Sequence, residues 1–277
     1  MLVLPDGGIL ATITDRFSLL HANALAHLKS DGKLIGTFGP EDFRFLAGIA
    51  LQTDGKILVA GEPSFHNGFD SGRAVLQRFE PNGAFDVGFT PPVFGPNAQG
   101  ACLCLSVMLV QPDQRILVSG NFGSVNGLRR TNLVRLLPNG SLDETFMPPA
   151  ASAETPLLLL PDGHILAWEQ GGAASGPVAN LMRLKPDGSL DRRLPLGVAA
   201  DGIGTRSAML QSDGRLLLNG YFVSSERSIN IPANRSFYFK SGIARFDLAD
   251  TDKPGVEFAA ADGYLAEVSE SVHLFKV

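Results

Sequence analysis

The chain has few cysteines, and their placement excludes the chemistry that cysteine most often supplies. Only Cys102 and Cys104 occur among 277 residues. Because alternate residues of a strand point to the same face, this i, i+2 spacing gives a poor geometry for a disulfide, and two ligands are too few for a zinc site. We expect both residues to be buried thiols.

Charge and long apolar runs are also scarce. Charged residues make up 18% of the sequence and the net charge is −5, whereas an average soluble domain has roughly 25% charged residues. We therefore expect neither nucleic acid nor an anionic membrane surface as a partner. The longest apolar run, residues 101–110, has the length of a strand and is far shorter than a membrane span.

The N-terminus lacks the marks of a signal peptide. No basic residue precedes the first apolar stretch, and Pro5, Asp6 and Gly7 interrupt that stretch after four residues. The sequence is therefore that of a cytoplasmic protein or of a piece of a longer exported protein.

The chain is instead rich in glycine and proline, which recur within a repeated motif. Each copy is an apolar strand, a turn with Asp and Gly, and a second apolar strand, at residues 3–12, 51–61, 110–120, 159–168 and 210–220. A second motif with the same kind of turn alternates with the first, at residues 27–38, 78–89, 135–146 and 183–194, with an eroded copy that begins at residue 245. The chain therefore contains five units of about 50 residues, each with two hairpins.

The turn chemistry predicts a pairing register. Proline presets the first turn position, Asp or Asn fits the second, and Gly accepts the left-handed third, which is a three-residue hairpin loop. In the first motif this register pairs apolar residues in four copies, namely Leu51 with Ile57, Val110 with Ile116, Leu159 with Ile165 and Leu210 with Leu216. In the second motif it places arginines opposite aspartates, namely Arg78 with Asp86, Arg135 with Asp143 and Arg183 with Asp191. We interpret these pairs as structural, because a catalytic site would occur once.

Four antiparallel strands in each of five successive units predict an all-β fold, a β-propeller with four-stranded blades. The propeller is expected to cover residues 1–253, with blades at about 1–46, 47–104, 105–154, 155–205 and 206–253. A larger ring, for example one with seven blades, also fits the sequence if the chain is part of a longer protein. A β-sandwich would lack the period, and a β-helix would have a much shorter one. The residues expected to wedge between blades are Phe38, Phe89, Phe146 and Phe258, with Leu194 in the fourth unit.

The third unit, residues 109–146, closely resembles the bacterial delta-60 repeat, in which an apolar strand is followed by PDGK, ILVGG, a loop with NG, ARLN, DGSLD and a terminal Phe. The resemblance covers roughly residues 1–258. It departs from the pattern at His27 and Ile35 in the first unit, at Leu194 in the fourth and at the second turn of the fifth. The resemblance implies a propeller from large, exported, multidomain bacterial proteins, a family without an assigned catalytic activity.

The tail, residues 254–277, has two interpretations. It resembles the opening strands of a Calx-beta domain, a calcium-binding sandwich module, through Gly255, Phe258, Tyr264, Val268, Glu270, Val272, Leu274 and Val277. That resemblance implies calcium as a cofactor, with most of its ligands in a part of the domain beyond this chain. The alternative is a last blade strand and a closing strand. No other cofactor is expected, and the metal ligands stay unknown.

Long loops are the expected place for a partner. In a propeller the tight turns share one rim and the longer connecting loops share the other. The longest of these loops, residues 221–242, combines aromatic and basic side chains, which favours a protein or glycan ligand. The candidate residues are Tyr221, Phe222, Arg227, Arg235, Phe237, Tyr238 and Phe239. The alternative is a loop that packs over the end of the propeller.

The strands expected next to the propeller axis have no titratable residue. They are residues 1–4, 47–52, 105–111, 156–160 and 207–211. General acid–base catalysis and metal binding therefore have no candidates there, and no catalytic residue is predicted. We expect a non-catalytic binding or scaffold propeller of an exported bacterial surface or secreted protein, attached to neighbouring domains. The alternative functions are a hydrolase or lyase with a site built from rim loops, and an intracellular interaction propeller of the WD type, whose Trp-Asp strand ends are absent.

Overall fold

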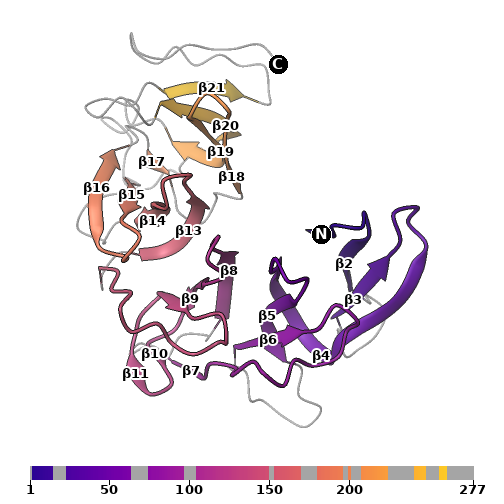
Figure 1. Ribbon diagram of the computed structural model, residues 1–277. Helices are drawn as coiled ribbons and strands as arrows, with labels where there is room; N and C mark the ends of the chain where they lie inside the picture. The colour runs from indigo at the N-terminus through magenta and orange to yellow at the C-terminus, as the bar shows by residue number, and fades with distance from the viewer. Residues whose placement is uncertain are drawn as a thin grey trace, which may run out of the picture. The chain divides into compact units, whose positions relative to one another are not determined.

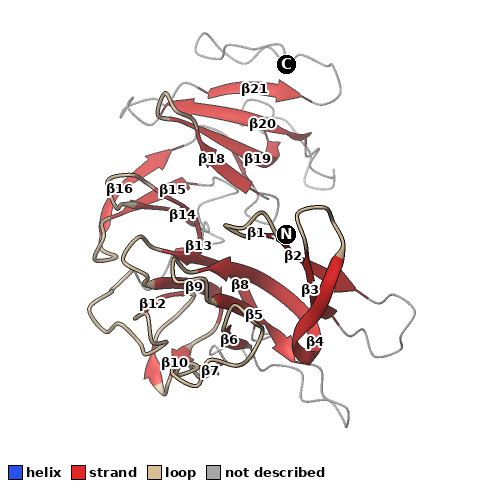
Figure 2. Ribbon diagram, turned by 45° about the vertical axis from the view of Figure 1, so that its right-hand side comes forward, coloured by secondary structure: helices blue, strands red, loops and turns tan. Residues whose placement is uncertain are grey.

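The computed structural model describes residues 2–14, 23–63, 74–96, 104–149, 153–169, 180–195, 199–200, 207–223, 240–247 and 256–260. Within these ranges the regular elements are all β-strands, and turns join them (Figure 2). The chain forms two compact units, Met1–Ala150 and Ala151–Val277.

The first unit contains three antiparallel sheets (Figure 1). The largest follows the chain order β1 (Leu2–Val3), β2 (Ile9–Thr14), β3 (Asn23–Leu28), β4 (Leu34–Leu51), β5 (Ile57–Pro63) and β6 (Val75–Phe79). A second sheet has the order β12 (Leu133–Leu136), β9 (Ile116–Asn121) and β8 (Cys104–Val110). A small third sheet has the order β11 (Leu128–Arg129), β10 (Ser124–Val125) and β7 (Phe94–Gly95).

The second unit contains two antiparallel sheets. One is the four-stranded sheet of β13 (Ala153–Leu159), β14 (Ile165–Glu169), β15 (Asn180–Leu184) and β16 (Leu190–Pro195). The other has the order β17 (Ala199–Ala200), β19 (Arg215–Val223), β20 (Lys240–Asp247) and β21 (Val256–Ala260), and β18 (Ser207–Leu210) also pairs with β19. Residues 256–260 of the tail thus form the outer strand of the fifth 50-residue repeat. Residues 254–255 and 261–277, which contain the rest of the Calx-beta resemblance, lie outside the described residues.

The repeated turns have one geometry, because local chemistry determines it. In the turn at Asp6, Gly7 N donates to Leu4 O and Leu4 N donates to Gly8 O. The Asp6 carboxylate accepts from Gly8 N at 2.9 Å, so the side chain holds the turn that it starts. The third position has φ near +85° where it is glycine, as in Gly55 and Gly163. The same pattern recurs at the other first-motif and second-motif turns, from residues 29–33 to 211–215.

The pairing register of the first motif is confirmed in all four copies that were predicted. The paired residues are Leu51 with Ile57, Val110 with Ile116, Leu159 with Ile165 and Leu210 with Leu216.

The second motif follows its predicted register in two copies. Asp86 N donates to Arg78 O, and Asp143 N donates to Arg135 O. The third prediction is wrong in register, because a β-bulge between Arg183 and Leu184 moves Arg192, not Asp191, opposite Arg183. In repeats 2 and 3 the chain turns away directly after the aspartate, whereas β16 continues to Pro195 in repeat 4.

Both faces of the second repeat are buried, as expected for a sheet between two others. Ile57 and Val59 of β5 pack in a core with Leu10 and Leu25 of the first repeat. Leu58 and Ala60 point the other way, into a core with residues of the third repeat that include Ile116, Val118, Phe122 and Val134. This explains why strands such as β5 read as continuous apolar runs rather than as alternating patterns.

The predicted wedge residues have mixed outcomes. Phe89 lies in the core shared by repeats 2 and 3, as predicted. Phe146 and Leu194 are buried. The side chains of Phe38 and Phe258 are not among the described ones. The same holds for the side chain of Cys104, which was predicted to be a buried thiol. The expected boundary between the first two blades, at residues 46 and 47, falls inside the continuous strand β4.

Candidate functional site

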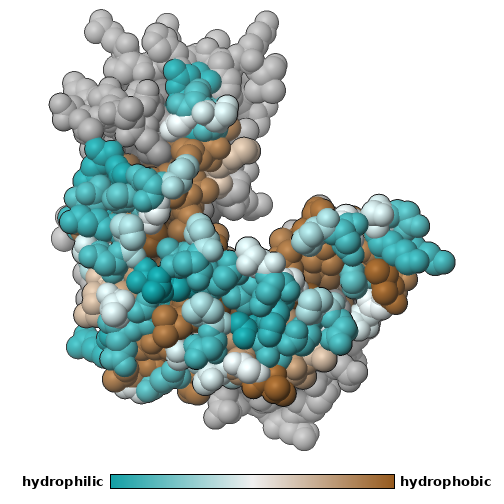
Figure 3. All heavy atoms as spheres, in the orientation of Figure 1, coloured by the Kyte–Doolittle hydropathy of each residue, from teal (hydrophilic) through white to brown (hydrophobic). Residues whose placement is uncertain are grey.

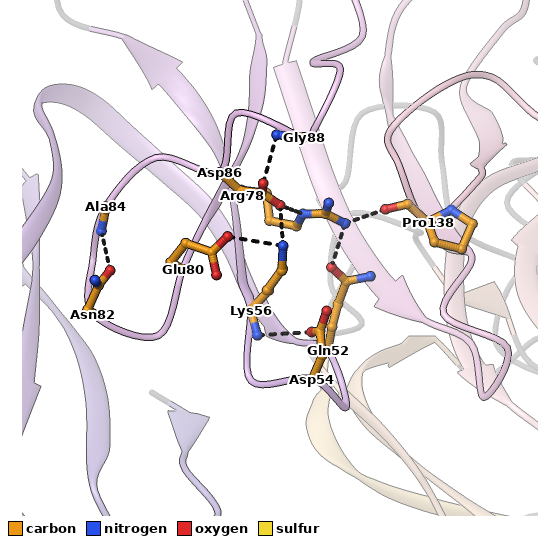
Figure 4. A network of polar contacts seen from close by, with 10 residues as sticks. All are labelled: Gln52, Asp54, Lys56, Arg78, Glu80, Asn82, Ala84, Asp86, Gly88 and Pro138. Carbon is orange, nitrogen blue, oxygen red and sulfur yellow. Dashed lines mark hydrogen bonds and ion pairs between the residues drawn. The ribbon is translucent and has the colours of Figure 1, made fainter.

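A network of charged and polar side chains lies at the turns of the second repeat (Figure 4). Arg78, on β6, donates from Nε to Asp86 Oδ2 at 2.7 Å, and both residues are about nine-tenths buried. Arg78 Nη1 donates to Gln52 Oε1 at 3.1 Å and to Pro138 O of the third repeat. The guanidinium also lies over the ring of Phe89, 4.7 Å from its centroid. Arg78 thus connects the two turns of its own repeat through Gln52 and Asp86. It also contacts the wedge residue Phe89 and, through Pro138, the third repeat.

Lys56 is the second cation of this group and contacts both of its carboxylates. Its Nζ lies 2.8 Å from Asp86 Oδ2 and 3.0 Å from Glu80 Oε1. The hydrogen bond from Lys56 and the one from the backbone of Gly88 outweigh burial and lower the pKa of Asp86 to about 2. The same carboxylate raises the pKa of Lys56 above its usual value. Asp86 and Lys56 are therefore both charged at neutral pH.

The third repeat contains the same arrangement, with one cation changed from lysine to arginine. Arg135 Nε donates to Asp143 Oδ2 at 2.8 Å, and its guanidinium lies 4.7 Å from the centroid of Phe146. Arg115 takes the place of Lys56, with Nε 3.5 Å from Asp143 Oδ2. Burial would raise the pKa of Asp143, but hydrogen bonds from Thr145 and Arg135 outweigh it and the pKa is lowered. Repetition of the arrangement supports a structural role.

The fourth repeat departs from this arrangement. Arg183 Nη2 lies 2.6 Å from Asp162 Oδ2, whereas Arg183 Nε lies 3.5 Å from Asp191 Oδ2. Asp162, half-exposed on the first-motif turn, also lies 3.1 Å from His164 Nδ1. The arginine thus turns to the neighbouring hairpin because the bulge has moved its predicted partner.

Gln114 is a contact residue that sequence reasoning missed. It occupies the turn position that is Gly7, Gly55, Gly163 and Gly214 in the other copies, and it has a φ of +67°. Such a conformation costs a side-chain-bearing residue roughly 1 kcal/mol. In return, Gln114 Oε1 accepts from Thr53 N of the second repeat at 2.9 Å, and Gln114 O accepts from Gln52 Nε2 at 3.4 Å. Gln114 could have been identified from the sequence, because it is a polar residue at a turn position that is glycine in the other copies.

The residues predicted to bind a partner are mostly outside the description. Tyr221 and Phe222 lie in β19, where they pair with Ser241 and Lys240 of β20. Their placement in a loop is therefore corrected, since the strands extend further than the turn pattern suggested. Arg227, Arg235, Phe237, Tyr238 and Phe239 lie outside the described residues.

Catalytic and metal sites were not expected next to the axis. Two strands are longer than expected and contain titratable residues that the predicted ranges left out. Strand β13 begins at Ala153 and contains Glu154, and β4 begins at Leu34 and contains Glu41, Asp42 and Arg44. Among the described residues, no group of three or more His, Cys, Asp or Glu could hold a metal ion. The described ranges likewise contain no helix with the length and hydropathy of a membrane span.

The low pKa of Asp86 predicts a pH dependence of stability. A carboxyl group whose pKa is lowered by folding stabilises the native state above its ordinary pKa of 3.8, and this contribution is lost as the pH falls through the folded value of about 2. We expect the free energy of unfolding of the wild type to exceed that of Asp86→Asn at pH 6, and the difference to shrink below pH 4. Urea unfolding of both proteins across this range measures it. A difference that stays constant down to pH 2 would contradict the role of Asp86.

The repeated antiparallel sheets and their shared cores define a β-propeller fold. A family described as "Domain of unknown function (DUF5122) beta-propeller" matches residues 52–89, 111–146 and 160–193, which begin and end at the repeated motifs. No curated protein sequence matches the chain.

Among the similar solved structures, one has a TM-score above 0.5 and supports the fold. A puromycin hydrolase mutant is 14% identical, with a TM-score of 0.55, and the match covers 98% of this chain and 38% of that one. A protein of unknown function from Bacteroides caccae is 13% identical over 92% of this chain and 91% of that one, with a TM-score of 0.41. A streptogramin B lyase is 15% identical over 95% and 86% of the two chains, with a TM-score of 0.44. At these identities the similarity concerns the fold alone.

Proposed function

We propose that this chain is a non-catalytic β-propeller module that binds a partner or serves as a scaffold in an exported bacterial surface or secreted multidomain protein. The observation that carries the proposal is that the recurrent charged residues pair with one another inside the fold. In the second and third repeats, Arg78, Asp86, Arg135 and Asp143 are buried and paired, and each arginine covers a phenylalanine of its own repeat.

The electrostatics of these groups support a structural role over a catalytic one. A general base works best when its pKa lies near the working pH. Asp86, with a pKa of about 2, is far from that condition and would accept a proton poorly at neutral pH. The pKa of Asp143 is also lowered. The pairs therefore stabilise the stacking of sheets rather than prepare a proton transfer.

The resemblance to delta-60 repeats supports an exported location and neighbouring domains in a longer polypeptide. The long-loop rim is then the surface for a protein or glycan ligand. Calcium is part of the proposal only through the Calx-beta resemblance of residues 254–277.

Activity assays with the purified chain test the proposal. We expect no turnover of p-nitrophenyl esters, of simple lactones or of uronate-containing polysaccharides, assayed by released nitrophenol, acid release and ultraviolet absorbance. The control is Arg227→Ala/Arg235→Ala, which alters the predicted rim loop only. Turnover by the wild type that this double variant loses would overturn the proposal and favour a hydrolase or lyase with a rim-loop site.

A further inference from the structure

The first-motif turn of the fourth repeat carries a histidine where the two preceding repeats carry a permanent cation. His164 occupies the position that Lys56 holds in the second repeat and Arg115 in the third. Lys56 contacts Asp86, and Arg115 contacts Asp143. Histidine is the side chain whose charge ordinarily changes between pH 5 and pH 8. This position therefore titrates in the fourth repeat and keeps its charge in the other two.

One ring nitrogen of His164 lies between an anion and a cation. His164 Nδ1 is 3.1 Å from Asp162 Oδ1 and 3.3 Å from Arg183 Nη2. Burial would raise the pKa of Asp162, but hydrogen bonds from the backbone and the ring of His164 outweigh it and the pKa is lowered, so Asp162 is an anion at neutral pH. A single nitrogen cannot donate to the carboxylate and accept from the guanidinium at the same time.

The charge of the ring therefore decides which neighbour His164 binds. In the neutral ring, Arg183 favours the tautomer with its proton on Nε2, because Nδ1 then accepts a hydrogen bond from Arg183 Nη2. In the protonated ring, Nδ1 donates to Asp162 instead. The ring and the guanidinium are then two positive charges in direct contact, and they repel each other. Protonation thus strengthens the contact of His164 with Asp162 and displaces Arg183.

Arg183 has a second carboxylate within reach. Its Nε lies 3.5 Å from Asp191 Oδ2 and is buried without a hydrogen-bond partner among the described residues. A buried donor without a partner is unfavourable. In repeats 2 and 3 the corresponding atoms, Nε of Arg78 and of Arg135, donate to the second-motif aspartate at 2.7 Å and 2.8 Å. A small displacement toward Asp191 gives Arg183 the contact that its counterparts make.

The other charged groups around this cluster do not compensate a charged ring. The second-motif turn, which packs on this hairpin, contributes Lys185 and Asp187, and these attract each other. Strand β16 contributes Arg192, which is opposite Arg183 in the register and adds positive charge beside it. The side chain of His164 is 21% exposed, so water can protonate it. In Figure 3 the surface over β15 and β16 is mostly hydrophilic.

We propose that His164 and Arg183 form a proton-dependent switch in the fourth repeat. When the ring is neutral, Arg183 binds Asp162 and His164. When the ring is protonated, His164 binds Asp162 and Arg183 moves to Asp191, as the arginines of repeats 2 and 3 bind their own aspartates. Because Asp191 belongs to β16, the outer strand of its sheet, one proton changes how this edge strand is held to β15. The switch is independent of the proposed binding role.

Nuclear magnetic resonance of the whole chain at pH 5 and pH 8, between which histidine changes its charge, tests the switch. The signal to follow is the exchange of the Arg183 Nε proton with water. Its rate is divided by that of the exposed Arg129 in the same sample, which removes the intrinsic effect of pH. We expect this ratio to be about fivefold lower at the lower pH, because the proton is then hydrogen-bonded to Asp191. The change should follow the titration of the His164 ring signals.

Two substitutions at the same position fix the charge. His164→Lys has the cation of Lys56 at both pH values, so the low ratio should be present at both. His164→Gln is uncharged and should keep the high ratio at both. The control is His27→Gln, at a histidine of the first repeat, which should change with pH as the wild type does. Backbone amide spectra confirm that each variant is folded.

The proposal is overturned if the wild-type ratio is the same at both pH values or if His164→Gln still shows the change. Crystal structures of the wild type at the two pH values give a second measurement. At the lower pH, Arg183 Nε should lie within hydrogen-bond distance of Asp191, and an Arg183 that still contacts His164 there would also overturn the proposal.

Discussion

Replacement of Gly140 by alanine is expected to lower the free energy of unfolding by roughly 2–5 kcal/mol, the sum of a strained backbone and an overpacked contact. Gly140 has a φ of +90° in the second-motif turn of the third repeat. An added Cβ would lie 2.7 Å from Cε2 and 2.8 Å from Cζ of Phe89, and also against Thr90 O. Relief of that contact is difficult, because Phe89 is buried and Thr90 N is fixed to Asn139 O at 2.8 Å.

The matched control for Gly140→Ala is Gly32→Ala. Gly32 occupies the same turn position in the first repeat with a φ of +82°, but an added Cβ would meet nothing within 4 Å. This variant pays the backbone cost alone, about 1 kcal/mol. Urea unfolding of both variants separates the two contributions. Equal losses would show that the contact between Phe89 and the next repeat does not require glycine at position 140.

Much of the architecture can be predicted from sequence because local chemistry determines it. In the turn of residues 52–56, Asp54 holds its own hairpin through Lys56 N, and Gly55 supplies the left-handed position, so both effects act within five residues. Once the turn is fixed, the register of Leu51 with Ile57 follows from it. Because this chemistry recurs in most copies, the repeat and the propeller can be recognised from the sequence.

The features that sequence reasoning missed depend on contacts between segments. Arg183 and Asp191 have the same spacing as Arg78 and Asp86, but the fourth repeat lacks the tight turn that Gly88 makes on Asp86, and β16 runs on with a bulge instead. Gln114 is strained within its own turn, and the reason lies in another repeat, at Thr53. The interaction of Gln114 is not local, so no turn or strand pattern reports it.

Contacts between repeats are made in two ways. Charged residues that recur join one sheet to the next, as in the contact from Arg78 to Pro138. The hairpin of β10 and β11 joins repeats 2 and 3 without charged residues, because it pairs with β7 and because Phe122 and Val125 lie in the core that the two repeats share.

Arg78→Met is expected to lower the free energy of unfolding by about 3–5 kcal/mol, because it leaves Asp86 buried with a single cation. It also removes the hydrogen bonds to Gln52 and Pro138 that join two turns and two repeats. Arg183→Met, at the matched position of the fourth repeat, should cost about 1 kcal/mol or less, because Arg183 pairs with the half-exposed Asp162. Urea unfolding gives both free energies, and hydrogen exchange of peptides 75–89 and 181–194 locates each effect.

A second substitution distinguishes the buried charge from the lost packing. Arg78→Met/Asp86→Asn removes the buried carboxylate that has lost one of its two cations but keeps an acceptor for Gly88 N, so it should recover part of the stability that Arg78→Met loses. If the double variant is no more stable than Arg78→Met, the arginine acts through its contacts with Phe89 and Pro138 rather than through Asp86. Arg183→Met and Arg78→Met could instead lower the free energy of unfolding equally. In that case burial of Arg78 with Asp86 does not determine the loss in the second repeat, and the structural role assigned to the Arg78 network is wrong.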